Sequence, residues 1–196
     1  MTYLPIQDYG LIGNMRTAAL VGINGSVDWL CLPRFDSPSV FAALLDHRKG
    51  GSFRIRPDEE GTHHQQFYWP DTNVLVTRFL CSDGAAELTD FMPVGRNTAD
   101  SGSSFQLIRR LTVVNGSIAF KVKCRPSFNY GRDEHSTGTT DRGAVFASPS
   151  VHLGLATSVP LDREGPGVVG RFELRQGESA VFVLRQIERG QDCGAC

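Results

Sequence analysis

The chain has 196 residues, a mass of 21.5 kDa and a formal net charge of −1, and 40% of its residues are hydrophobic. This length suits a single domain with a substantial apolar core. Because the net charge is close to zero, the chain as a whole has no electrostatic attraction to nucleic acid or to an anionic membrane, and we expect neither as a partner.

Cysteine usage and the absence of targeting signals indicate the compartment. The N-terminus shows no charged region followed by an apolar stretch, and no apolar run approaches the roughly 18 residues that span a bilayer. An odd number of scattered cysteines is typical of reduced thiols, so we expect a cytoplasmic protein. The cysteines are Cys31, Cys81, Cys124, Cys193 and Cys196.

Two short motifs suggest ligands but lack the context that those ligands need. Gly165 to Gly170 matches G-x-G-x-x-G, yet a strand rather than a helix is predicted to follow it, which argues against a dinucleotide. Cys193 and Cys196 form a C-x-x-C pair without a second pair of ligands. We therefore expect no cofactor and no metal.

The strands are predicted from period-2 alternation of apolar residues, which runs through most of the chain. Four turns between such segments each predict a β-hairpin, because Asn-Gly and Asp-Gly readily adopt hairpin geometry. In chain order these turns are Asn24-Gly25, Asp83-Gly84, Asn115-Gly116 and Gln176-Gly177-Glu178.

Helical signal is scarce. The best candidate is one short helix near residues 38–46, where Ser37 is a suitable N-cap and Pro38 suits the first helical position. Many short strands at hairpin spacing favour an all-β fold, an antiparallel β-sandwich, around this single helix.

Acidic and aromatic residues crowd the first forty positions. Strand alternation predicts Asp28 on the face of Leu30 and Leu32, opposite Trp29. A carboxylate near an apolar face needs a partner, so Asp28 or Asp36 is expected to hold a loop through Arg34, Arg16 or backbone N–H groups. The alternative is that these residues form a wall facing a sugar, and we favour the structural interpretation.

Several separate segments, in a fixed order from Ile6 to near the C-terminus, resemble glycoside hydrolase family 15, which includes bacterial and archaeal glucoamylase-like and trehalase-like enzymes. The segments are Tyr9-Gly10-Leu11-Ile12-Gly13-Asn14, Gly25 to Pro38, Gly50-Gly51-Ser52-Phe53-Arg54-Ile55, Pro70 to Leu75, Thr89-Asp90-Phe91-Met92-Pro93 and Arg125 to Arg132.

The resemblance implies a parent protein with an N-terminal super-sandwich, a linker and an α/α barrel that carries two catalytic glutamates. Inverting hydrolysis places two such carboxyls about 6.5–9.5 Å apart. The resemblance gives a domain at residues 1–190, a linker start at residues 191–196 and no catalytic residue in this chain. It also implies α-glucoside substrates for the parent, such as maltooligosaccharides or trehalose.

The leading hypothesis is thus a non-catalytic domain that packs against the barrel and shapes the rim of its cleft. The candidates for that face, or for contact with substrate, are Arg16, Asp28, Trp29, Arg34 and Asp36. One alternative is an independent carbohydrate-binding module, and another is a small hydrolase that uses Asp28 and Asp36. A face intended for the barrel would also allow a homo-oligomer.

Overall fold

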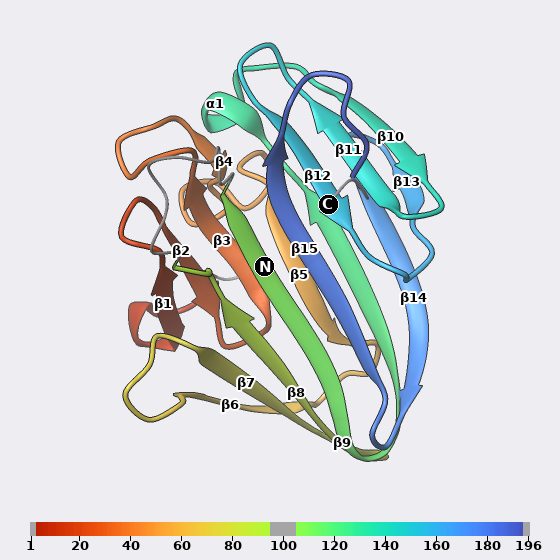
Figure 1. Ribbon diagram of the computed structural model, residues 1–196. Coiled ribbons are helices and arrows are strands. Elements are labelled where there is room, and N and C mark those ends of the chain that lie inside the picture. Colours follow the sequence, from red (N-terminus) through yellow and green to blue (C-terminus); the bar gives the residue numbers. More distant parts are fainter. Residues whose placement is uncertain (1–2, 95–104, 194–196) are drawn as a thin grey trace.

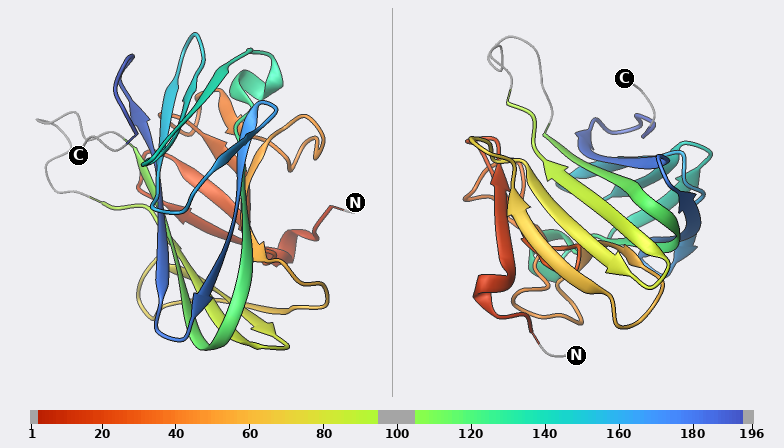
Figure 2. Two further views of the ribbon diagram at one scale, coloured as in Figure 1. Left: turned by 90° about the vertical axis from the view of Figure 1, so that its right-hand side faces the viewer. Right: turned by 90° about the horizontal axis from the view of Figure 1, so that it is seen from below.

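The computed structural model describes residues 3–94 and 105–193, and it confirms the all-β antiparallel prediction (Figure 1). The strands form one continuous hydrogen-bonded sheet that folds into two facing layers, here called sheet A and sheet B. Every strand pairing in both layers is antiparallel among the described residues. The two layers are visible edge-on in Figure 2.

Sheet A contains the first five strands of the chain and the strands that flank the second half of β9. Its members are β1 (Tyr9–Gly13), β2 (Ala18–Gly22), β3 (Ser26–Cys31), β4 (Ser39–Phe41), β5 (Ser52–Pro57), β9 (Gln106–Arg125), β14 (Gly167–Arg175) and β13 (Asp162–Glu164).

Sheet B contains the strands that flank the first half of β9. Its members are β6 (His63–Tyr68), β7 (Leu75–Cys81), β8 (Gly84–Phe91), the same β9, β15 (Ser179–Ile187), β12 (His152–Ala156), β11 (Gly143–Ala147) and β10 (Ser136–Thr140). A 3-10 turn, η1 (Ile6–Asp8), precedes β1, and the short helix α1 (Phe128–Gly131) follows β9.

The core lies between the two layers and is rich in phenylalanine. Phe182 of sheet B packs against two rings of sheet A, with centroid distances of 6.3 Å to Phe53 and 5.9 Å to Phe172. Phe172 stacks on Phe120, 5.7 Å away. Such ring pairs add to the free energy gained by burying apolar area, so these contacts hold the layers together.

One ion pair lies inside this core. Arg109 and Asp90 are both completely buried, and the guanidinium binds both carboxylate oxygens at 2.8 and 3.1 Å. Arg109 also donates to the backbone oxygens of Phe53 and Gly25 and lies 4.7 Å from the Phe53 ring centre. Since Phe53 and Gly25 belong to the sheet A side, Arg109 joins the layers through polar contacts.

Two of the four predicted hairpins are confirmed. The Asn24-Gly25 turn joins β2 and β3, and the Asp83-Gly84 turn joins β7 and β8. Gly25 has φ +76°, which suits glycine in a tight turn. These turns form as predicted because the strands on both sides find their best partners next to them in the sequence.

The other two hairpin predictions are right about the turns and wrong about the strand pairing. The chain bends back at Asn115-Gly116, where Gly116 has φ +81°, but the two halves of the 20-residue strand β9 enter different layers and do not pair with each other (Figure 1). Likewise, β14 and β15 are joined by the turn at 176–178 but pair with different halves of β9 rather than with each other. In both cases the turn connects the two layers, and each flanking strand finds its hydrogen-bonding partners within its own layer.

The helix prediction near residues 38–46 is also wrong. Residues Ser39–Phe41 form β4, which pairs with β3, and short turns follow it. All three residues of β4 are buried, and a short apolar run of this kind has no polar face to show which period it follows. The one α-helix among the described residues is α1, which packs against β4.

Candidate functional site

Three of the five sequence candidates lie close together at one end of the sandwich. Arg16 is in the turn between β1 and β2, while Arg34 and Asp36 are in the loop between β3 and β4. The backbone N–H of Phe35 donates to the carbonyl of Arg16, which joins this turn and loop. Arg34 and Asp36 form an ion pair at 3.6 Å with both side chains mostly in solvent, which is one of the pairings that the structural interpretation named.

Large exposed apolar side chains lie on the same segments and on a neighbouring turn. Tyr68 exchanges two hydrogen bonds with the backbone of Leu11, and the Asn73 side chain donates to the carbonyl of Gly13. The turn after β6 is thereby fixed against β1. Five large apolar residues of these segments each expose 43 to 82% of their surface. We call them the apolar end: Leu11, Met15, Phe35, Tyr68 and Trp69.

Sequence reasoning missed the apolar end. The sequence does contain a clue to it, because Met15, Phe35 and Trp69 lie in turns. Large apolar side chains in surface turns cannot reach the core and remain exposed. A group of exposed large apolar side chains on neighbouring segments is typical of an interaction surface.

Asp28 lies elsewhere, on the outer face of sheet A, and its predicted placement is wrong. Leu20 pairs with Trp29 and Val21 pairs with Val27, so Asp28 is the extra residue of a β-bulge. The bulge breaks the alternation, because Val27 and Leu30 are buried while Asp28 and Trp29 between them are both partly exposed. Asp28 therefore does not share the face of Leu30 and Leu32.

The Asp28 carboxylate is held by two hydroxyl groups. Tyr9 donates to one oxygen at 2.9 Å and Ser26 donates to the other. Burial raises the pKa of Tyr9 above its usual range, and the charge and hydrogen bond of Asp28 raise it further. The phenol therefore keeps its proton and acts as a permanent donor to Asp28. These residues, with Arg54 and His47, line a hollow of about 270 Å³.

Trp29 is neither a core residue nor part of a flat stacking platform. Its ring is half-buried and lies 6.4 Å from the ring of Tyr130, with an angle of 46° between the two planes. Arg132 contacts the same tyrosine, 6.0 Å from the ring centre. Stacking on a sugar ring favours coplanar aromatic faces, and this tilted pair does not provide them.

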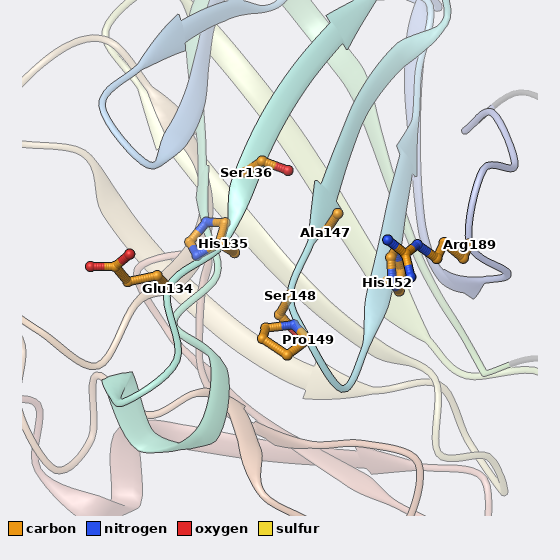
Figure 3. Close-up of a pocket in the computed structure, with 8 residues that line it drawn as sticks. All are labelled: Glu134, His135, Ser136, Ala147, Ser148, Pro149, His152 and Arg189. Atoms are coloured by element: carbon orange, nitrogen blue, oxygen red, sulfur yellow. The ribbon is translucent and has the colours of Figure 1, made fainter.

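A larger hollow of about 530 Å³ opens beside β10, β11 and β12 (Figure 3). Its polar side chains stand apart, with Glu134 and His135 on one side and His152 beside Arg189 on the other. The His135 ring is already bound to the carbonyl of Pro166 and packs against Phe128 and Phe146. This arrangement gives His135 a structural role.

Within residues 3–94 and 105–193, no group of three metal-ligating side chains comes together. Cys193 is buried, packs against Gly154 and receives a hydrogen bond from Arg185 on its carbonyl. Burial raises the pKa of its thiol. Cys196, its partner in the C-x-x-C pair, lies outside the described residues. No helix in the described part is long and apolar enough to cross a membrane.

The fold and this surface define the chain as an antiparallel two-layer β domain with one exposed apolar end. A family model described as "Trehalase-like, N-terminal" matches residues 2–168, and the chain belongs to this family of trehalase-like N-terminal domains.

Curated relatives agree with this assignment. The chain is 35% identical to a trehalase of Thermoplasma volcanium over 92% of its own length and 29% of the relative. It is 41% identical to Trehalase 1 of Sulfolobus acidocaldarius over 83% of its length and 27% of the relative. A trehalase of Mycolicibacterium smegmatis is 32% identical over 92% of the chain and 30% of the relative. The chain thus spans less than a third of these relatives.

Proposed function

We propose that this chain is the non-catalytic N-terminal domain of an inverting, family 15 type glycoside hydrolase. Its apolar end docks on the helical catalytic domain of that parent. The observation that carries the proposal is the exposed cluster of Leu11, Met15, Phe35, Tyr68 and Trp69 in a chain that matches less than a third of its trehalase relatives.

The surroundings of the apolar end suit such an interface. Its large side chains provide area to bury, while Arg16, Arg34 and Asp36 supply a charged rim around them. This combination of an apolar centre with a polar edge is the usual anatomy of a protein interface. In the parent these loops border the cleft and leave the chemistry to the barrel.

The names of the relatives favour trehalose as the substrate of the parent, ahead of maltooligosaccharides. The described cysteines are all free thiols, which supports the proposal that the parent works in the cytoplasm. The domain comprises residues 1–190 and the linker begins at residues 191–196.

A chimera tests the docking. The matching segment of the Thermoplasma volcanium trehalase is replaced by this chain, and trehalose hydrolysis is measured with the native apolar end and with Phe35→Ser plus Trp69→Ser. We expect activity with the native end and a loss of at least tenfold with the double substitution. Val114→Ser, an equally exposed apolar residue on β9, is the matched control and retains activity.

The separate chain, incubated with trehalose, maltose and soluble starch, is expected to release no glucose above a blank. Turnover by the chain alone contradicts the non-catalytic role. A chimera that is inactive with the native apolar end, or equally active without it, contradicts the docking.

A further inference from the structure

The outer face of sheet A carries a strongly basic groove that the proposed docking does not use. A hollow of about 340 Å³ opens over β5 and β9, and no carboxylate lines it. The basic groove is defined by six residues: His47, Arg54, Arg56, Lys121, Lys123 and Arg125.

Strand pairing forces these cations together. Arg54 lies directly opposite Lys123, and Arg56 lies directly opposite Lys121. Like charges in directly opposed positions of an antiparallel pair are destabilising. With strands about 4.8 Å apart and residues i and i+2 about 7 Å apart, the four cations occupy the corners of a small rectangle. An anion bound above them would relieve the repulsion.

The protein neutralises this cluster only in part. Glu164 pairs with Lys123, and Asp58 pairs with the neighbouring Arg171 at 3.2 Å. The side chains of Lys121 and Arg125 form no hydrogen bond or ion pair with another described residue. Their charges remain available to an external ligand.

Arg54 stands at the centre of the groove. Its Nε donates to the carbonyl of Asn24 at 3.4 Å, and its two terminal nitrogens donate to no described residue. Burial lowers the pKa of this guanidinium, and the charge of Arg56 lowers it further. A partly desolvated guanidinium with free donors is well suited to bind the oxygens of a phosphoryl group.

The second hollow, of about 270 Å³, adjoins the first and shares His47, Ser52 and Arg54 with it. Its lining is of a different kind, with the Asp28 carboxylate and the hydroxyl of Tyr9. Each Asp28 oxygen accepts one hydrogen bond from the protein and retains a lone pair for another donor. Neutral hydroxyl groups fit this position, whereas a second anion would be repelled by Asp28.

We propose that the two hollows together bind a phosphorylated sugar, with the phosphoryl group over Arg54, Arg56, Lys121 and Lys123 and the sugar hydroxyls toward Asp28. The two recessed hollows suit a small molecule better than a flat acidic protein surface. The inference does not depend on the proposed docking, because the groove and the apolar end share no residue.

Isothermal titration calorimetry on the 196-residue chain tests the proposal with glucose 6-phosphate, inorganic phosphate and glucose at one low salt concentration. We expect glucose 6-phosphate to bind at least tenfold more tightly than either other ligand. Arg54→Gln and, independently, Lys121→Gln weaken this binding at least tenfold. Asp28→Asn lowers the affinity for glucose 6-phosphate toward that for phosphate and leaves phosphate binding unchanged or stronger.

Arg110→Gln is the matched control, because it removes the same charge from an exposed position of the same strand, outside the groove. It keeps full affinity. Thermal unfolding without ligand checks the fold, and Lys121→Gln is expected not to lower the midpoint since it removes a repulsion.

Three results would overturn the proposal. One is the absence of binding by glucose 6-phosphate. Another is equal affinity for phosphate and glucose 6-phosphate, which would leave a simple anion site. The third is tighter binding of an acidic peptide such as oligoglutamate, which would assign the groove to a protein partner.

Discussion

Asp90 and Arg109 face each other across β8 and β9, and their ion pair is completely buried between the two layers. Asp90 belongs to the segment Thr89 to Pro93, one of those that carry the family resemblance. The guanidinium also binds Gly25, the first residue of another such segment. It binds the carbonyl of Phe53 in a third segment as well, so three of the segments are joined by one buried side chain, which gives each a structural purpose.

Asp90→Asn is expected to destabilise the chain by about 3–5 kcal/mol, because it leaves the buried guanidinium without a counter-charge. The double variant Asp90→Leu plus Arg109→Met should cost less than Asp90→Asn alone, since it removes both buried charges and keeps apolar volume. Urea unfolding of the three proteins measures the difference. A cost below about 1 kcal/mol for Asp90→Asn contradicts this account.

Gly116→Ala tests the path of β9. Gly116 has φ +81°, and an added Cβ would lie 1.8 Å from the carbonyl oxygen of Asp83. Gly177 has a similar φ of +85° but open space around its Cβ position. We expect Gly177→Ala to cost about 1–2 kcal/mol for the left-handed conformation alone, and Gly116→Ala to cost clearly more. Equal unfolding midpoints for the two variants would show that the crowding at β9 is absent.

The reactivity of Cys81 should depend steeply on pH. Burial, with a hydrogen bond to Glu59 and the charge of that residue, raises the pKa of this partly exposed thiol to about 11. At pH 8 only about one thiol in a thousand is ionised, and the thiolate is the reactive form. Labelling with a disulfide reagent in a Cys196→Ser background should therefore accelerate about tenfold per pH unit up to pH 10.

Cys81→Ser is the control for that experiment and should abolish the pH-dependent labelling of the folded chain. Cys31, Cys124 and Cys193 are buried and should react only on unfolding. Fast labelling of Cys81 at pH 7 would contradict the raised pKa.

The apolar end should make the isolated chain associate with itself at high concentration, because no partner covers it. Sedimentation velocity is expected to show concentration-dependent dimers that Phe35→Ser plus Trp69→Ser remove. These residues are exposed, so the double substitution should leave the unfolding midpoint nearly unchanged. Dimers that persist in the double variant, while Val114→Ser behaves like the native chain, would place the contact elsewhere.

The sequence predicted the all-β class and the hairpins whose partners are adjacent in the chain. At Gly116 it located the turn but not the pairing, because turn preference is local, whereas the partners of β9 are other segments of the chain: β5, β8, β14 and β15. The placement of Asp28 failed for a related reason. A bulge shifts the face of every residue after it, and nothing in the alternation of β3 marks where the extra residue sits.

The candidate site could be predicted only in part. The loop containing Arg34 and Asp36 was found through its charges, and the ion pair between them was one of several pairings that the sequence left open. The basic groove was not, because its cations are spread over residues 47–56 and 121–125 and meet only through the register of β5 with β9. The amino-acid composition does not reveal such a cluster, because acidic residues elsewhere bring the net charge of the whole chain to −1.

The strand β9 couples the unfolding of the two layers. Its first half supplies ladder partners to sheet B and its second half to sheet A, without a loop between them. Neither layer can lose its central strand while the other keeps an intact one. Amide protons on both sides of Gly116 should therefore exchange with solvent through the same global opening. Cleavage of the chain at that point would leave each layer with only one half of β9 as its central strand.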